Sequence, residues 1–291
     1  MLNRRVVRAS AIYLFALFAL LLAVACGGYN PGSRLVDANG HHLNIRCSGD
    51  GTPAVVLISG LATDNHDWVE VEKQVSEFTQ ICSYDRFGLG ESDHRDGTPT
   101  SQTATDDLHA LISASGISGQ VLLVGHSYGG LIAQLYAAKH PDDTFGVVLV
   151  DSLHEENLDR AGVILGEPTM TTFMRALTAN PEGVDIRASL DQVQGLDLGD
   201  TPVTVLTAGD HDLPDIIDPG VGRQLISAWL YSQRELSKLS TTGVQFIAEG
   251  SGHCIQCDRP NVVVDAIREM ADGVRFTIGL SERPFFLPVT E

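Results

Sequence analysis

The sequence has few basic residues for its size. Its 291 residues include 19 Lys and Arg against 37 Asp and Glu, which gives a formal net charge of −18 at pH 7. An acidic surface repels a phosphate backbone unless a dense basic stripe interrupts it, and the sequence contains no such cluster. We therefore expect no binding to nucleic acid.

The sequence also lacks the signatures of disorder and of repeat architecture. Charged residues make up only 19% of the chain and hydrophobic residues make up 43%, which is the composition of an ordinary globular protein. No internal repeat and no low-complexity tract is present. We expect one folded domain rather than two small ones, although the length alone allows either.

No apolar run in the sequence has membrane-spanning length. The longest, Ala11 to Ala25, has roughly 15 residues, whereas about 20 are needed to cross the hydrocarbon core. It is preceded by three arginines, Arg4, Arg5 and Arg8. This order is typical of an export signal over residues 1–25.

The end of this run resembles a bacterial lipoprotein processing site. Small residues, Ala23-Val24-Ala25, precede Cys26, although such sites usually have Leu where this chain has Ala23. The resemblance implies that Cys26 is lipidated and that residues 26–33 form a tether to the membrane surface. Simple secretion, an uncleaved anchor and a buried N-terminal helix are the alternatives.

Four further cysteines remain, and an even number in an exported protein favours disulfides. Cys254 and Cys257 are close enough in sequence for a loop disulfide, and Cys47 and Cys82 could link neighbouring strands. The alternative for the second pair is two unpaired, buried thiols. A zinc site would need a second pair of ligands at similar spacing. None is evident, and we expect neither a metal nor a cofactor.

The pattern of apolar runs predicts an α/β fold. Ala38-Asn39-Gly40 separates two alternating segments, which is a strong hairpin signal. Apolar runs of strand length then alternate with segments of helical period, as in a mostly parallel sheet of about eight strands with helices on both faces. The remaining predicted strands cover residues 54–58, 80–84, 121–124, 146–150, 203–206 and 244–248, and the predicted helices cover 103–115, 130–139, 222–239 and 260–271.

One connection is longer than a crossover helix requires. Residues 153–200 lie between two predicted strands and mix Met170, Phe173 and Met174 with acids and glycines. Long insertions on such scaffolds are often functional. We expect a lid within a single domain over residues 34–291, with an inert insertion as the alternative.

Gly125-His126-Ser127-Tyr128-Gly129 indicates a nucleophile by its context. The motif follows an apolar strand directly and precedes a helical segment. The glycines permit a turn tight enough to hold the serine in a strained conformation with its hydroxyl projecting. The helix N-terminus then favours developing negative charge. Ser127 is therefore the predicted nucleophile.

Together with other segments, this motif resembles the α/β-hydrolase superfamily over residues 34–275. The segments 57–62 and 84–92 are similar to the family's oxyanion loop and to its next strand end. The resemblance implies that the oxyanion is bound by the backbone N–H groups of Leu61 and Tyr128. It also implies an esterase or lipase rather than family members that use a carboxylate nucleophile.

A serine nucleophile needs a base, and the base needs an acid to orient it. His253 follows the last predicted strand and is the expected base. For the acid, the family's Gly-x-x-Asp pattern favours Asp212, with Asp151 and Asp210 as alternatives that also end strands.

The mechanism implied is acyl transfer to water through an acyl-enzyme, with a small apolar acyl substrate. Peptide, lactone or carbon–carbon bond hydrolysis would use the same residues. A surface lipoprotein that keeps the fold only for binding is the rival from another class. The sequence leaves the oligomeric state open.

Overall fold

A nine-stranded sheet forms the centre of the computed structural model, which describes residues 32–211, 217–273 and 286–288. The strand order is β1-β2-β4-β3-β5-β6-β7-β8-β9. The strands are Arg34–Ala38 (β1), His41–Ser48 (β2), Ala54–Ile58 (β3), Ile81–Tyr84 (β4), Val121–His126 (β5), Thr144–Val150 (β6), Val203–Ala208 (β7), Val244–Ala248 (β8) and Phe286–Pro288 (β9). From β4 to β8 all neighbours are parallel, whereas β1, β2 and β9 add antiparallel edges.

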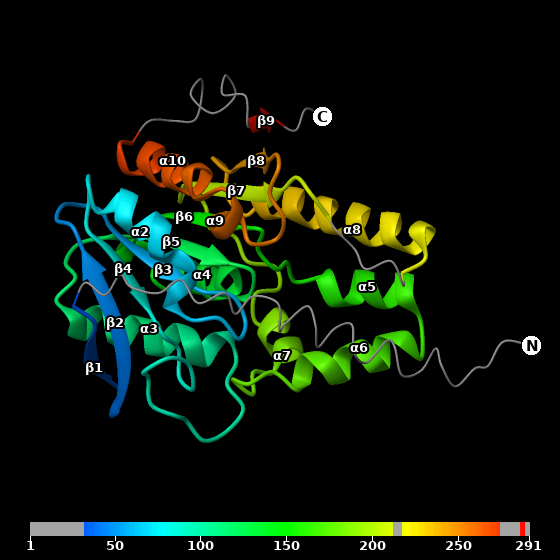
Figure 1. The fold of residues 1–291 in the computed structure, drawn as a ribbon, viewed down its shortest axis with the longest axis horizontal. Coiled ribbons are helices and arrows are strands. Elements are labelled where there is room, and N and C mark those ends of the chain that lie inside the picture. Colours follow the sequence, from blue (N-terminus) through cyan, green and yellow to red (C-terminus); the bar gives the residue numbers. More distant parts are fainter. Residues whose placement is uncertain (1–31, 212–216, 274–285, 289–291) are drawn as a thin grey trace, which may run out of the picture.

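Helices cover both faces of the sheet (Figure 1). One apolar layer joins the sheet to helices α3 (Ser101–Ser115), α4 (Tyr128–Lys139) and α8 (Pro219–Ser237). The other joins it to α2 (Val69–Val75), α9 (Ile255–Asp258) and α10 (Pro260–Ala271). Two short 3-10 helices, η1 (Asn65–Trp68) and η2 (Pro141–Asp143), lead into α2 and β6. The central strands are therefore buried on both sides, which is why they are continuous apolar runs.

The expected fold class is confirmed. Each predicted strand is present, with bounds that differ by a few residues at most, and the four predicted helices are α3, α4, α8 and α10. Asn39 and Gly40 adopt positive φ angles of 59° and 83° between β1 and β2, as the hairpin signal requires. The structure adds α2 and the edge strand β9, which the sequence patterns did not predict.

Three helices fill the long connection between β6 and β7: α5 (Asn157–Leu165), α6 (Thr169–Thr178) and α7 (Ile186–Asp191). We call residues 153–200 the insertion. Its partly buried apolar side chains, among them Met170, Phe173 and Met174, pack against the same apolar layer as α3 and α4. The insertion is thus continuous with the domain core.

Both predicted cysteine pairs are joined in the structure. Cys47 and Cys82 face each other across the antiparallel strands β2 and β4, and Cys254 is bonded to Cys257. The predicted signal segment and Cys26 lie outside the described residues. Within the described ranges, no helix combines the length and apolarity needed to cross a bilayer.

Candidate active site

Ser127 lies at a sharp turn between β5 and α4. Its backbone has φ 52° and ψ −116°, a left-handed conformation that costs a non-glycine residue on the order of 1–3 kcal/mol. A Cβ atom at Gly125 would lie 2.5 Å from the carbonyl oxygen of Gly129, and one at Gly130 would collide with the Ser152 side chain. The glycines around Ser127 are therefore required by the tightness of the turn.

The register of the sheet brings Asp151 beside this turn. His126 and Val150 are paired on the parallel strands β5 and β6, so the residues that follow them, Ser127 and Asp151, lie side by side. Asp151 is also strained, with φ 40°. Its buried carboxylate accepts hydrogen bonds from the Ala208 backbone N–H at 3.1 Å and from Nε1 of Trp229 at 3.0 Å.

His253 completes this arrangement from the loop after β8. Its Nδ1 lies 2.7 Å from Oδ2 of Asp151, with 2% of the aspartate side chain and 35% of the histidine side chain exposed. Because a carboxylate accepts, Nδ1 carries the proton, and Nε2 keeps the lone pair that a general base needs. The histidine is thus oriented by Asp151 on one edge and open on the other.

The preference for Asp212 as the acid is corrected by this contact. Nδ1 of His253 has one hydrogen to donate, and Asp151, the alternative, receives it. Asp212 lies outside the described residues. Asp210 has an exposed side chain, and its backbone N–H bonds Ser251. The reason for the correction is the register: β6 adjoins β5, whereas β7 is one strand further from Ser127.

The surroundings of Asp151 keep it ionised. Burial alone would raise the pKa of its carboxyl group, but the hydrogen bonds from His253, Trp229 and Ala208, with the charge of His253, hold that pKa below its ordinary value. Trp229 comes from α8 and also packs edge-on against the His253 ring, with centroids 5.9 Å apart. No local sequence pattern pointed to this tryptophan.

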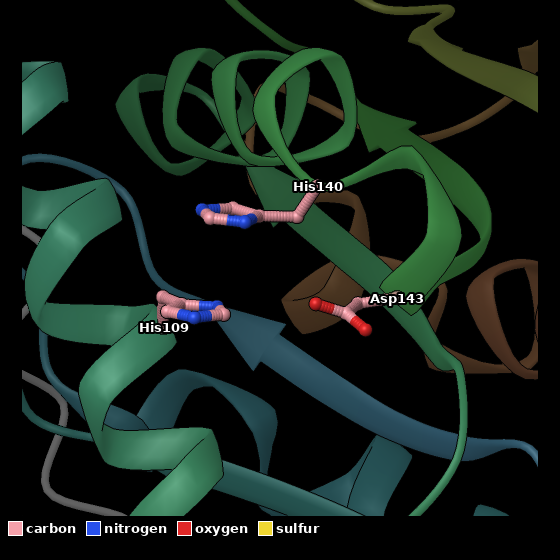
Figure 2. Close-up of side chains that lie close together, drawn as sticks. All are labelled: His109, His140 and Asp143. Atoms are coloured by element: carbon pink, nitrogen blue, oxygen red, sulfur yellow. The ribbon is translucent and has the colours of Figure 1, made fainter.

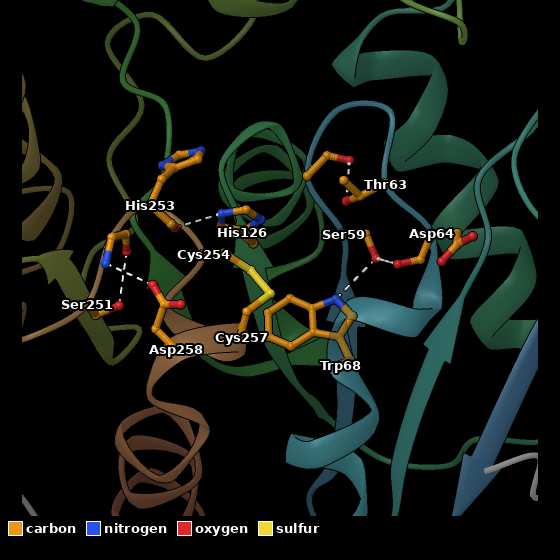
Figure 3. The surroundings of a disulfide bond; sticks show 12 residues. Ser59, Thr63, Asp64, Trp68, His126, Ser251, His253, Cys254, Cys257 and Asp258 are labelled. Carbon is orange, nitrogen blue, oxygen red and sulfur yellow. Dashed lines mark hydrogen bonds between the residues drawn. A yellow bond between two sulfur atoms is a disulfide. The ribbon is translucent and has the colours of Figure 1, made fainter. Parts of the chain in front are cut away.

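His126 packs between the serine turn and the histidine loop (Figure 3). Its Nε2 donates to the carbonyl oxygen of His253 at 3.0 Å, and the two rings lie 4.7 Å apart. Burial, followed by the charge of His253, lowers the pKa of His126 to about 3. Among the described residues, no hydrogen bond joins Oγ of Ser127 to His253, a contact that in enzymes often tightens only when substrate binds.

Two backbone donors lie on the segments that meet at Ser127. The β3–η1 loop (residues 59–64) passes close to the serine, since a Cβ atom at Gly60 would lie 3.5 Å from the Ser127 Cβ. Within the described chain, neither the Leu61 N–H nor the Tyr128 N–H has a hydrogen-bond partner. Both donors that the family resemblance implied are therefore unengaged.

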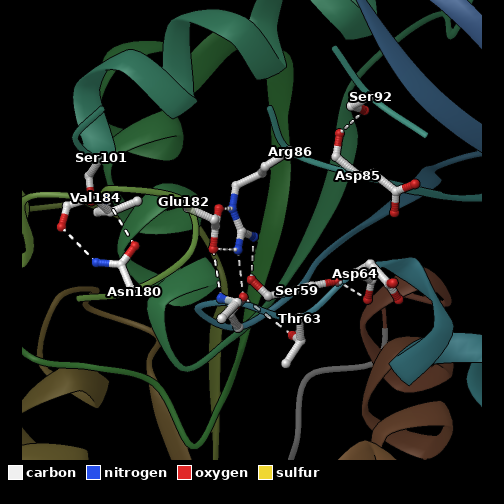
Figure 4. Close-up of polar contacts among 12 residues, drawn as sticks. Ser59, Thr63, Asp64, Asp85, Arg86, Ser92, Ser101, Asn180, Glu182 and Val184 are labelled. Atoms are coloured by element: carbon white, nitrogen blue, oxygen red, sulfur yellow. Dashed lines mark hydrogen bonds and ion pairs between the residues drawn. The ribbon is translucent and has the colours of Figure 1, made fainter. Parts of the chain in front are cut away.

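A buried ion pair fastens the β3–η1 loop to the insertion (Figure 4). Arg86 donates to the carbonyl oxygens of Ser59 and Gly60 at 2.6 and 2.5 Å and to the Glu182 carboxylate at 2.8 and 2.9 Å. Glu182 also accepts the Ala62 N–H at 2.7 Å, where the backbone has φ 61°. Burial would lower the pKa of Arg86, but Glu182 raises it, so the guanidinium stays charged.

Segment 84–92 contributes to these contacts through two residues. Arg86 holds the β3–η1 loop, whereas Asp85 holds the turn itself by accepting the Asn65 N–H at 3.0 Å and the Asn44 amide at 2.8 Å. Glycine is required at position 90, because a Cβ atom there would collide with the Asp85 carboxylate. The sequence identified this segment but not its partner Glu182, which is 96 residues away.

The disulfide between Cys254 and Cys257 begins at the residue after His253 (Figure 3). It closes the short helix α9, which packs against η1 and α10. The covalent link therefore restricts the backbone that carries His253.

Apolar side chains lie on two segments that pass next to Ser127. Leu61 and Leu153 are partly buried residues packed against the core layer, and the Leu153 N–H bonds the Ser127 carbonyl oxygen at 3.1 Å. Met170, Phe173 and Met174 of α6 belong to the same apolar layer.

Comparisons with known proteins agree with this architecture. A family model described as the alpha/beta hydrolase family matches residues 55–266. The chain is 24% identical over 237 residues to YqjL, an uncharacterised protein of Bacillus subtilis, covering 81% of this chain and 89% of YqjL. Among solved structures, a thermophilic esterase of Thermogutta terrifontis has a TM-score of 0.60 at 22% identity, covering 84% of this chain and 99% of the esterase. A membrane phospholipase A has a TM-score of 0.59 at 20% identity, covering 94% and 96%.

Proposed function

This chain belongs to the alpha/beta hydrolase family, and we propose that it is a serine hydrolase that cleaves a carboxylic ester. The observation that carries the proposal is that a strained Ser127 and Asp151 follow neighbouring strands, and that His253 is hydrogen-bonded to Asp151. Ser127 is only partly buried at the turn, and His253 has a lone pair directed away from its acid partner. No metal or cofactor is needed for this chemistry.

The proposed reaction proceeds in two halves. In the first, Oγ of Ser127 attacks the ester carbonyl while Nε2 of His253 takes its proton, and the oxyanion receives the N–H groups of Leu61 and Tyr128. His253 then returns the proton to the leaving alcohol. In the second, water attacks the acyl-enzyme by the same route and releases the acid. Asp151 stabilises the imidazolium that forms in each half.

An apolar acyl group is the substrate class that we propose. The strongly negative net charge disfavours anionic substrates, and the segments that pass next to Ser127 carry the apolar side chains of Leu61 and Leu153. An esterase and a phospholipase A are among the structures with this fold. Because a fold alone does not determine a reaction, the bond type rests on the residues around Ser127.

A fluorophosphonate probe tests the nucleophile directly. We expect labelling of the wild-type protein, loss of labelling in Ser127→Ala, and unchanged labelling in Ser113→Ala, which removes an exposed hydroxyl on α3. Absence of labelling in both the wild type and Ser127→Ala would favour a protein that uses the fold only for binding.

A panel of p-nitrophenyl esters of graded chain length then tests the substrate class. We expect kcat/KM to rise from acetate towards longer acyl chains, because each methylene buried against an apolar surface contributes about 0.8 kcal/mol. A labelled protein that turns over none of these esters would point to amide, lactone or carbon–carbon bond hydrolysis by the same residues.

We also propose that the enzyme acts outside the cytoplasm as a membrane-anchored lipoprotein. The proposal rests on Arg4, Arg5 and Arg8, on the apolar run that follows them and on Cys26. The two cysteine pairs suit an oxidising compartment. Metabolic labelling with a fatty acid, lost in Cys26→Ser, would support the anchor, whereas an unlabelled protein in the medium would indicate simple secretion.

A further inference from the structure

Two histidines and an aspartate meet at the edge of the sheet that lies opposite the candidate active site. His109 lies in α3, His140 follows α4 directly, and Asp143 ends η2, just before β6. One ligand atom from each residue lies within 4.8 Å of those of the other two. Figure 2 shows both imidazole rings and the carboxylate gathered between α3 and the connection from α4 to β6.

We propose that His109, His140 and Asp143 bind a divalent transition-metal cation of the zinc type. Two imidazole nitrogens and one carboxylate oxygen form a ligand set that zinc takes in proteins, with metal–ligand distances of about 2.0–2.2 Å. Ligand atoms bound tetrahedrally to one such ion lie about 3.4 Å apart. The ligand atoms of this cluster lie within 4.8 Å of one another, so closure around an ion requires them to approach by up to about 1.4 Å.

One imidazole of the cluster has an unmet hydrogen-bonding atom. Nε2 of His140 is buried and has no hydrogen-bond partner among the described residues. A buried polar atom without a partner costs about 1–3 kcal/mol, and coordination to a cation would remove that cost. The His109 and His140 rings are stacked, with centroids 4.0 Å apart and planes 3° apart, so the two rings must tilt from this arrangement for both to coordinate one ion in their ring planes.

The second ring of the cluster has the kind of outer contact that metal-binding histidines show. Nδ1 of His109 lies 3.4 Å from the hydroxyl of Tyr136 on α4. Histidine ligands commonly use one ring nitrogen for the metal and the other for a hydrogen bond that fixes the ring. This contact leaves Nε2 of His109 for the ion.

The charges around the cluster also favour a cation. Asp142 precedes Asp143 in η2, and the nearby ammonium of Lys139 is paired with Asp106 at 3.1 Å. Elsewhere in the described chain, His42 with Asp93 and His66 with Asp64 form histidine–carboxylate pairs of 3.2 and 2.9 Å. Among the described residues, neither pair belongs to a group of three possible ligand atoms within 4.8 Å of one another, and both pairs provide matched controls.

The proposed site is distant from the proposed hydrolase chemistry. Asp143 precedes β6 and Asp151 follows it, so the seven residues of the strand separate them by eight steps of about 3.3 Å, or roughly 26 Å. Because the ligands come from α3 and from the connection after α4, a bound ion would link these elements. Its expected effect is on stability rather than on turnover.

Titration of the untagged, full-length protein with zinc chloride, followed by calorimetry, tests the proposal. We expect one ion per chain, affinity reduced at least tenfold in both His140→Ala and Asp143→Asn, and unchanged affinity in His42→Ala. We also expect zinc to bind more tightly than magnesium, which prefers oxygen ligands. Asp143 is exposed, so its variant decides the matter if His140→Ala does not fold.

Thermal unfolding of the same proteins provides a second readout. Zinc at about a hundred times its dissociation constant should raise the Tm of the wild type and of His42→Ala by several degrees, with no shift in Asp143→Asn. If the wild type shows no saturable binding when zinc is added to about 100 times the protein concentration, the proposal is overturned. Equal affinities in the wild type and both cluster variants would overturn it as well.

Discussion

Replacing Glu182 with Gln changes the charge of the contact between the insertion and the β3–η1 loop but not its size. The carboxylate accepts three hydrogen bonds, from the Ala62 N–H and from two nitrogens of Arg86. A glutamine oxygen can keep the two that reach Oε1. The third would bring a glutamine NH₂ group against Nε–H of Arg86, so that two donors face each other.

The magnitude follows from these contacts. One charge-assisted hydrogen bond is lost, at about 1.5–3 kcal/mol, and Arg86 keeps its buried charge with a neutral partner. Breaking a buried pair typically costs about 3–5 kcal/mol, but Arg86 retains its bonds to the Ser59 and Gly60 carbonyl oxygens. We therefore expect Glu182→Gln to reduce the free energy of unfolding by about 2–3 kcal/mol.

The same change should affect catalysis through the position of Leu61. Loss of one oxyanion donor costs about 10²–10³ in kcat, and a displaced donor costs only part of that. We expect kcat on a p-nitrophenyl ester to fall about tenfold, with a smaller change in KM, because the Leu61 N–H is used in the transition state rather than in binding.

The matched control is Asp159→Asn, which neutralises an ion pair with Arg187 inside the same insertion. That pair is exposed, with 39% of the Arg187 side chain and 68% of the Asp159 side chain accessible. We therefore expect a free energy of unfolding within about 1 kcal/mol of the wild type and a kcat within about a factor of two. A Glu182→Gln protein with reduced stability but wild-type kcat would refute the positioning role. An equal loss of kcat in Asp159→Asn would refute it too.

Four further outcomes are expected. Asp151→Asn should lower kcat about 10⁴-fold by removing the acceptor that fixes the His253 tautomer, whereas Asp210→Asn should match the wild type in the same ester assay. Trp229→Phe should shift the acid limb of the kcat/KM profile, since the indole donor helps to lower the pKa of Asp151. The pKa of His126 is about 3 in the folded protein and about 6.5 in the unfolded chain, so the unfolded state binds more protons between these values. Lowering the pH from 6.5 to 4.5 should therefore reduce the free energy of unfolding by up to about 1.4 kcal/mol per pH unit. Denaturant titrations at each pH measure this loss, which His126→Asn should lack. Reduction of the Cys254–Cys257 disulfide should lower kcat without unfolding the chain, as tested by activity and circular dichroism in a thiol reductant.

The pH window of the His126 effect is separate from that of Asp151. A carboxyl group with a lowered pKa contributes stability above its unfolded value of about 3.9, and that contribution is lost only as the pH falls through the lower folded value. Burial also lowers the pKa of His154, so other histidines add to the slope between pH 4.5 and 6.5. Subtracting the curve of the His126→Asn variant isolates the contribution of that one ring.

The parts of the fold and site that could be predicted are those with a local pattern. Buried parallel strands are continuous apolar runs, and a glycine-flanked serine between a strand and a helix is recognisable without any distant contact. His253 could be predicted because the last predicted strand, which is β8 in the structure, ends just before it. The acid could not be chosen, because Asp151, Asp210 and Asp212 all follow strands and the choice depends on which strand adjoins β5.

The remaining site contacts are long-range and have no periodic signal. Arg86 meets Glu182 across 96 residues, and Asp151 meets Trp229 across 78. Glu182 lies in a segment between α6 and α7 where an acid suggests only a solvated surface. A single sequence cannot show which of the many acids of an acidic chain is buried against a particular arginine.

The distribution of backbone strain supports the assignment of the site independently of side-chain chemistry. Among the described non-glycine residues, positive φ angles occur at Asn39, in a hairpin turn, and at Ala62, Ser127 and Asp151. The backbone N–H of each of the last three donates to another part of the chain. Ala62 donates to the Glu182 carboxylate, Ser127 to the Val150 carbonyl oxygen and Asp151 to the Leu206 carbonyl oxygen. Strained residues persist only where their surroundings over-determine them. Since one of these anchors comes from the insertion, the insertion helps to maintain the geometry of the β3–η1 loop, and its removal should disorganise the oxyanion donors rather than simply uncover them.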